Sequence, residues 1–138
     1  MDESQFKSYD QSSVIPIFAG QVVLITSNRS RRWIVPKGLV EPDLTPQESA
    51  AQEALEEAGL LGSVSQEPVG FYEYEKWNGI CHVTVYSMSV TEVLDDWDEK
   101  GWRDRAFVSP SDALEWIEDP VLNGVVSKFL DQTGLLAD

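Results

Sequence analysis

Three glutamates, Glu53, Glu56 and Glu57, are spaced so that a helix would place them on one face. Residues three and four apart are neighbours on a helix, and at about 3.6 residues per turn these three span an arc of roughly 100°. Clustered carboxylates repel one another unless a cation lies among them. Mg²⁺ is the natural candidate, because it binds a few carboxylates together with substrate phosphates. The alternative is a solvated acidic helix face, which the spacing alone favours.

The helix that would carry these glutamates is predicted to run from Thr45 to Gly59. Thr45 is a good N-cap, Pro46 suits the first helical position, and Glu48 lies three residues after the cap. This is a capping box with proline at its first position. Gly59 can supply a left-handed C-terminal cap. The side opposite the glutamates, expected to lie against a sheet, consists of Ala51, Ala54, Leu55 and Ala58.

The stretch that begins at Gly38 resembles the Nudix box, whose pattern is G-x5-E-x7-R-E-U-x-E-E-x-G-U, with U a bulky aliphatic residue. The positions in register are Gly38, Glu53, Glu56, Glu57, Gly59 and Leu60. The motif is long, and it is much more specific than a lone glycine pattern. The resemblance covers most of the chain, from about residue 13 to residue 130.

The stretch departs from the box at three positions. Leu44 stands where the first glutamate is expected, with Asp43 beside it, Gln52 replaces the arginine, and Ala54 replaces a larger aliphatic residue. The changes at Leu44 and Gln52 affect a structural ion pair of the family. The carboxylates that bind metal in the family are all present.

The resemblance implies a hydrolase in which Glu53, Glu56 and Glu57 are catalytic and hold Mg²⁺ or Mn²⁺, with the Gly38 carbonyl as a further ligand. The implied reaction is metal-assisted attack of water on phosphorus in a pyrophosphate linkage. The general base is left open between Glu53 and a glutamate of the distal loop such as Glu92. The implied fold is an α/β/α sandwich around a mixed β-sheet.

A group of basic residues precedes the box. Arg29, Arg31 and Arg32 lie in one turn, and Lys37 follows the short strand predicted over residues 33–35. The group could be a solvated turn with extended side chains. Beside a carboxylate–metal site we favour a phosphate clamp, because arginine makes bidentate contacts with phosphate.

The order of predicted elements agrees with an α/β layering. Strands are expected over residues 13–19, 21–26, 33–35, 69–77, 80–90 and 106–108, and two further helices after Ser109 and Asp119. Residues 1–12 are predicted to be an N-terminal arm and residues 13–138 a single domain. Asn78 and Gly79 predict a type I′ hairpin turn. The lone histidine, His82, is on a strand more often a packed or surface side chain than a ligand. Near Lys76, across the hairpin, it could instead contact phosphate oxygens.

One branch of the Nudix family is especially similar, the diphosphoinositol polyphosphate phosphohydrolases, which also hydrolyse dinucleoside polyphosphates. Residues 32–36, 41–42 and 90–97 carry this similarity, which implies that Arg32 and His82 lie near the phosphates. Lys37-Gly38-Leu39 stands where that branch has three glycines.

Composition limits the function further. The chain has 138 residues, the size of one domain, and a net charge of −14. That charge argues against a protein that coats nucleic acid or binds anionic membranes. The partner that the resemblance implies is a small phosphorylated substrate. A polar N-terminus, the lack of a long apolar run and a single cysteine, Cys81, predict a cytoplasmic protein. A homodimer is left open.

Other kinds of site are weaker candidates. No glycine-rich Walker loop or Gly-x-Ser-x-Gly turn is present. A faint calcium-loop pattern at Asp96, Asp98 and Gly101 fails, because Lys100 and Phe107 replace oxygen ligands. The alternatives to the hydrolase are a non-catalytic nucleotide-binding module on the same fold and a purely structural acidic domain.

Overall fold

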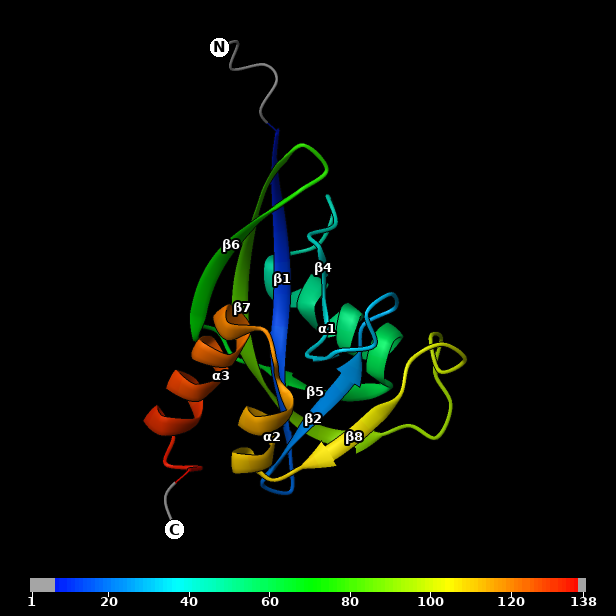
Figure 1. Ribbon diagram of the computed structural model, residues 1–138. Helices are drawn as coiled ribbons and strands as arrows, with labels where there is room; N and C mark the ends of the chain where they lie inside the picture. The colour runs from blue at the N-terminus through cyan, green and yellow to red at the C-terminus, as the bar shows by residue number, and fades with distance from the viewer. Residues whose placement is uncertain (1–6, 137–138) are drawn as a thin grey trace.

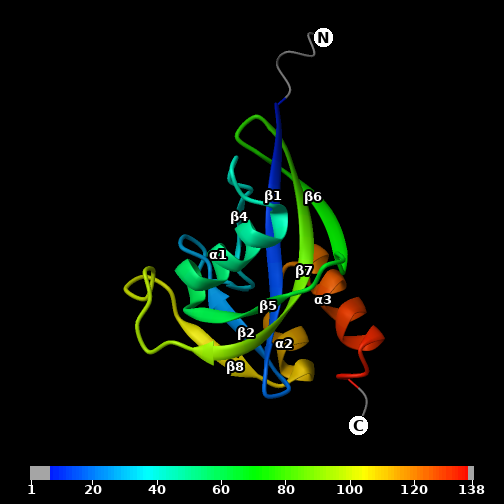
Figure 2. The same cartoon turned by 180° about the vertical axis from the view of Figure 1, so that it is seen from behind.

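The computed structural model describes residues 7–136, which form a mixed β-sheet covered by helices on both faces (Figures 1 and 2). The strands are β1 (Lys7–Phe18), β2 (Gln21–Thr26), β3 (Trp33–Ile34), β4 (Lys37–Leu39), β5 (Leu60–Val64), β6 (Gly70–Lys76), β7 (Gly79–Val93) and β8 (Arg105–Val108). The helices are α1 (Pro46–Ala58), α2 (Pro110–Trp116) and α3 (Pro120–Gln132). Within the described range no helix is long and apolar enough to cross a membrane.

Strand β1 runs through the middle of the sheet. It pairs in parallel with β7 from Lys7 to Ile17, and on its other side it pairs antiparallel with β4 and then with β2. The prediction that the strand starts at residue 13, after an arm, was wrong for residues 7–12. These residues are polar, but they pair with β7, and Gln11 and Ser12 are buried. Residues 1–6 of the predicted arm lie outside the described range.

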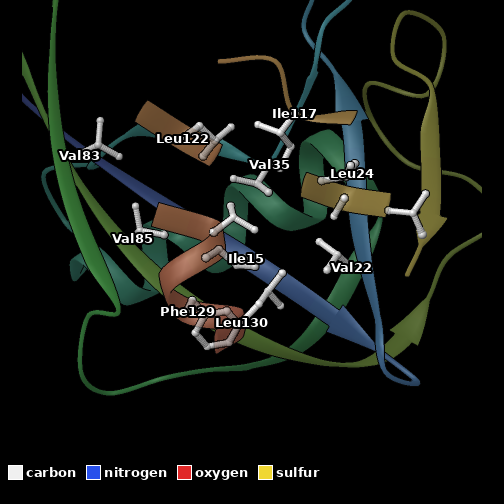
Figure 3. Packing of buried hydrophobic residues seen from close by; sticks show 13 residues of the cluster. Ile15, Val22, Leu24, Val35, Val83, Val85, Ile117, Leu122, Phe129 and Leu130 are labelled. Atoms are coloured by element: carbon white, nitrogen blue, oxygen red, sulfur yellow. The ribbon is translucent and has the colours of Figure 1, made fainter. Parts of the chain in front are cut away.

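Each face of the sheet has its own apolar core. Helices α2 and α3 cover one face, where Ile15, Leu24, Val85, Phe129 and Leu130 belong to the buried cluster shown in Figure 3. Helix α1 covers the opposite face with a second buried cluster. Figure 1 shows α2 and α3 in front of β1, and Figure 2 shows α1 on the near side after the half turn. The predicted α/β/α sandwich with a mixed sheet is therefore confirmed.

The ends of α1 are those that the sequence predicts. Thr45 Oγ1 accepts from the Glu48 backbone N–H at 3.1 Å, and the Thr45 N–H donates to Glu48 Oε1 at 2.9 Å. Gly59 ends the helix in the left-handed conformation, with φ of 67°. The face against the sheet is rotated from the predicted one. Its fully buried alanines are Ala50, Ala54 and Ala58, whereas Leu55 is 36% exposed.

The capping box of α1 gives a first stability prediction. We expect Thr45→Ala to lower the free energy of unfolding by about 1 kcal/mol, because the side-chain acceptor for the first helical turn is lost. Thermal unfolding should show a decrease of about 4 °C in Tm. An unchanged Tm would contradict a stabilising role for this cap.

Candidate functional site

Glu57 is the most buried of the three glutamates, although it carries a carboxylate. Its side chain is 9% exposed and lies between the backbone of β4 and the loop before β8. Oε1 accepts from the Lys37 backbone N–H at 3.1 Å, and Oε2 lies 3.4 Å from the Arg103 guanidinium. Both oxygens are therefore held by groups of the protein.

Glu53 lies one helical turn before Glu57, and Glu56 is the residue directly before it. The Glu53 carboxylate packs directly over Gly38, so closely that a Cβ atom at residue 38 would overlap with it. This contact explains the glycine, whose backbone φ is not in the left-handed region. Glu56 is half-buried, and its Oε1 accepts from Gln52 Nε2 at 2.8 Å. The structure thus brings Gly38 and the predicted carboxylates together at the junction of β4 and α1.

Burial and mutual repulsion make two of these carboxyls weak acids. Burial and then the charges of Glu57 and Glu56 together raise the pKa of Glu53 to about 8. Burial also raises the pKa of Glu57 to about 7, although Arg103 and the Lys37 N–H oppose the shift. Near neutral pH the pair therefore retains protons that a cation could replace.

The loop between β7 and β8 contributes two residues that the sequence analysis missed. Glu99 lies close enough for its charge to raise the pKa values of both Glu53 and Glu57. Arg103 Nε donates to Glu99 Oε1 at 2.7 Å, and the two residues are four positions apart in the chain. The 99–103 spacing of opposite charges, in a chain with few basic residues, is a signal that could have identified them.

The same loop also closes the C-terminal end of α1, as Figures 1 and 2 show from opposite sides. The Glu99 N–H donates to the carbonyl of residue 56, and the Trp97 indole N–H donates to that of residue 57. Arg105 donates to the carbonyl of residue 58 and the Leu94 N–H to that of residue 59. Since the last carbonyls of a helix have no partner within it, these bonds fix the end that carries Glu56 and Glu57.

The arginines of the predicted clamp lie in the turn between β2 and β3. Arg31 is in the left-handed region and is paired with Asp104 at 2.7 Å, while it also donates to the Trp102 carbonyl. Arg29 and Arg32 are exposed. Arg31 thus ties its turn to the β7–β8 loop, and phosphate binding by the three arginines stays a prediction.

Lys37 and Lys76 lie on one face of the sheet, and His82 lies on the other. Lys37 Nζ donates to the Tyr74 hydroxyl at 2.9 Å, and burial followed by repulsion from Lys76 lowers the pKa of Lys37. His82 pairs with Glu73 and is its direct partner in the β6–β7 register. Because side chains alternate along a strand, Lys76 shares the face of Tyr74 and not that of Glu73. Lys76 and His82 therefore lie on opposite faces, and contact of either residue with phosphate stays a prediction.

The hairpin turn that precedes β7 is also displaced from the predicted one. Its two central residues with positive φ are Trp77 and Asn78, rather than Asn78 and Gly79. Gly79 instead pairs with Lys7 of β1, where the backbones approach so closely that a Cβ atom would overlap. The shift by one residue makes Glu73, and not Glu75, the direct partner of His82.

The donors at the β4–α1 junction fit a hard divalent cation. No three His, Cys, Asp or Glu side chains among residues 7–136 already converge as a metal-binding group. The fit lies in the chemistry of the donors. The carboxyls of Glu53 and Glu57 repel each other and retain protons near neutral pH. The Glu56 carboxylate accepts a hydrogen bond from the amide of Gln52. A cation that displaced these protons would relieve the repulsion.

Comparison with known proteins identifies the family. A model of the NUDIX domain matches residues 9–129. The chain belongs to the Nudix family. Nudix hydrolases are pyrophosphohydrolases that act on acid anhydrides, and in general they use a divalent metal. The β4–α1 junction described above is the part of this chain that contains the Nudix box.

Similar Nudix proteins come from plants and animals. Diphosphoinositol polyphosphate phosphohydrolase 2 of Rattus norvegicus is 36% identical over 102 residues, which are 71% of this chain and 55% of that protein. Nudix hydrolase 12, mitochondrial, of Arabidopsis thaliana is 30% identical over 118 residues, 80% of this chain and 58% of that protein. The chain thus spans less than two thirds of the length of these relatives.

Solved structures show the same fold at lower identity. The solution structure of the E. coli ORF135 protein has a TM-score of 0.76 at 21% identity, and all of both chains is covered. The crystal structure of C. elegans Ap4A hydrolase has a TM-score of 0.72 at 17% identity, with 92% of this chain and 99% of that one covered. These likenesses support the α/β fold of the chain.

Proposed function

We propose that this chain is a metal-dependent hydrolase of a diphosphate linkage in a small phosphorylated substrate. The observation that supports it most is the pair of carboxyls with raised pKa values, the half-buried Glu53 and the buried Glu57, on the box helix of a Nudix protein. Glu53, Glu56 and Glu57, with the carbonyl of Gly38, would hold Mg²⁺ or Mn²⁺. The bound ion would neutralise phosphate charge and activate water.

Glu53 is the general base that we propose. Without a cation its carboxyl, with a pKa of about 8, holds a proton near neutral pH, so it would act as a base once a bound cation had displaced that proton. The other candidate, Glu92, is exposed and pairs with Leu61 in the β5–β7 ladder. The loop glutamate whose charge acts on Glu53 is Glu99.

A cavity beside Lys37 supports a substrate with a ring. It has a volume of about 210 Å³ and is lined by Ile34, Val35, Lys37, Tyr72, Glu73, Tyr74, Asp119, Val121 and Leu122. Lys37 lies between this cavity and the glutamates of α1, because its backbone N–H donates to Glu57 while its side chain lines the cavity. A ring bound there would place its phosphates beside Lys37, in the strand whose backbone N–H also holds Glu57.

The lining of this cavity favours a nucleotide over an inositol polyphosphate. An inositol polyphosphate presents many phosphates and little apolar surface, and it requires several cations. The cavity offers one lysine, with Lys76 nearby, and it also includes the carboxylates of Glu73 and Asp119. We therefore propose a nucleoside diphosphate-linked or dinucleoside polyphosphate substrate, with Arg29, Arg32, Lys37 and Lys76 as phosphate contacts.

Filling this cavity should weaken binding of the ring selectively. We expect Val121→Trp to raise KM for a nucleoside diphosphate-linked substrate by about tenfold, with kcat changed little, because ring contacts contribute mainly uniform binding. Val121 is 51% exposed, so the larger side chain can be accommodated without overpacking the core. Val121→Ala is the matched control and should leave KM within about threefold. A tryptophan variant with unchanged KM would place the ring elsewhere.

A substrate panel tests the proposed activity itself. The protein is incubated with Mg²⁺ or Mn²⁺ and nucleoside diphosphate-linked, dinucleoside polyphosphate and diphosphoinositol polyphosphate compounds, and the released products are separated. Metal-dependent release of a nucleotide supports the proposal. Binding of nucleotides without turnover would instead favour the non-catalytic module, for which the departures at Leu44 and Gln52 are the reason. A cytoplasmic location stays a proposal, since Nudix hydrolase 12 of Arabidopsis is named as mitochondrial.

A further inference from the structure

The box of this chain lacks the residues for its usual ion pair, yet its most buried glutamate has a cationic partner. Leu44 is apolar, and the neutral Gln52 is exposed and donates only to Glu56. Neither contributes a charge to Glu57, which is 9% exposed. Burying a carboxylate without a cation is costly, so the charge must be matched from another element.

Arg103 supplies that charge from the loop before β8. Its side chain is also 9% exposed, and its nitrogens point to three different groups. Nε donates to Glu99 Oε1 at 2.7 Å, and one terminal nitrogen donates to the Thr26 carbonyl at 2.8 Å. The other terminal nitrogen lies 3.4 Å from Glu57 Oε2.

The contact with Thr26 anchors this arrangement to the sheet. Thr26 ends β2 and is 3% exposed, and its hydroxyl accepts from the Asp104 N–H at 2.9 Å. A guanidinium is planar with donors in a fixed geometry, so a carbonyl on one side determines where the carboxylates on the other sides must lie. Lysine, with a single terminal nitrogen, would reach fewer of these partners.

We propose that Arg103 is a positioning residue that orients Glu57 and Glu99 towards the bound cation, and that it replaces the ion pair that Leu44 and Gln52 do not form. Without its charge, Glu57 and Glu99 repel each other, and the β7–β8 loop is pushed away from the end of α1. The proposal rests on the proposed function, because the oriented carboxylates belong to the proposed metal site.

Calorimetry with Mn²⁺ alone tests this role without any substrate. We expect Arg103→Gln to weaken Mn²⁺ binding by about 10- to 100-fold, the range seen when groups that orient metal ligands are removed. In an active protein kcat should fall by a similar factor, while KM changes by less than about threefold. Arg103→Lys keeps the positive charge but not the planar guanidinium with its several N–H donors. It should weaken Mn²⁺ binding by about three- to tenfold.

Restoring the family's ion pair tests the replacement directly. Leu44→Glu combined with Gln52→Arg in the Arg103→Gln background should return the Mn²⁺ affinity to within about threefold of the original chain. If Arg103→Gln does not fold, as circular dichroism would show, the same pair is introduced beside Arg103→Lys. Lys100→Gln is the matched control, because it removes a cation that donates to the Asp95 carbonyl in the same loop.

The outcomes separate this inference from the proposed function. Unchanged Mn²⁺ affinity in both Arg103 variants, or no recovery with the restored pair, would overturn the role of Arg103. An equal loss in Lys100→Gln would also overturn it, because any cation of the loop would then suffice. A chain that binds Mn²⁺ but hydrolyses no compound of the panel would contradict the hydrolase, whereas the calorimetry would still decide the role of Arg103.

Discussion

The Glu57→Gln variant is expected to lose metal-dependent turnover by at least about 10²- to 10³-fold. Glutamine keeps the size of the side chain and an oxygen for the Lys37 N–H, but it removes the charge beside Arg103. A cation would lose a charged ligand, and Arg103 would be left facing a neutral amide. The measurement is kcat at saturating Mg²⁺ on whichever panel compound is cleaved fastest, together with Mn²⁺ affinity by calorimetry.

The control for this prediction is Glu115→Gln in α2, which removes the same charge from an exposed position on the opposite face of the sheet. Its kcat should equal that of the original chain within about twofold, since exposed substitutions away from a site have small effects. If Glu57→Gln retained full turnover, the carboxylate of residue 57 would have no part in the chemistry. The box helix would then have to act through Glu53 and Glu56 alone.

Local signals explain why α1 could be predicted closely from the sequence. The capping box at Thr45, the proline after it and the left-handed Gly59 are short-range features, and the structure contains all three. The spacing of Glu53, Glu56 and Glu57 is likewise a property of one helix. These features depend on residues within a few positions of one another, so tertiary contacts did not need to be known.

The partners of the glutamates depend on long-range contacts, and they were missed for that reason. Arg103 reaches Glu57 across 46 positions of sequence, and nothing near residue 57 indicates which loop returns to it. Strands β4 and β5 were also missed, because Lys37–Leu39 is very short and Leu60–Val64 is largely exposed. Both are strands only because β1 and β7 present edges to them.

The pairing register of β6 and β7 differs from the predicted one because the turn between them lies one residue earlier. A turn placed one residue too late would make Glu75 the direct partner of His82, whereas the real register makes Glu73 that partner. In both registers Lys76 and His82 lie on opposite faces, because side chains alternate along each strand. The feature that fixes the turn is the contact of Gly79 with β1, and this contact belongs to the sheet rather than to the hairpin.

The metal-free protein is expected to lose stability as pH rises from about 5 to 8.5, and Mg²⁺ is expected to restore it. The pKa of Glu53 is raised from 4.5 in the unfolded chain to about 8 in the folded one. A carboxyl whose pKa is higher in the folded state binds its proton more tightly there than in the unfolded chain. Its contribution to stability is therefore fully present below pH 4.5 and is lost as pH rises through about 8. After allowance for partial solvation, the loss is about 1–3 kcal/mol.

Glu53→Gln tests the origin of this pH dependence. Glutamine has no proton to lose, so we expect a flatter curve of Tm against pH and, at pH 8.5, a metal-free protein that is more stable than the original chain. The same variant should gain less stability from Mg²⁺, because a carboxylate ligand is missing. Glu115→Gln should keep the original curve of Tm against pH.

Two results would contradict this prediction. If Glu53→Gln had the same pH dependence as the original chain, the destabilisation would belong to other carboxyls. If Mg²⁺ stabilised Glu53→Gln and the original chain equally, residue 53 would be excluded from the metal site. If Glu53→Gln were more stable without metal but less active, the carboxylates that destabilise the metal-free protein would be the ones that the bound cation requires.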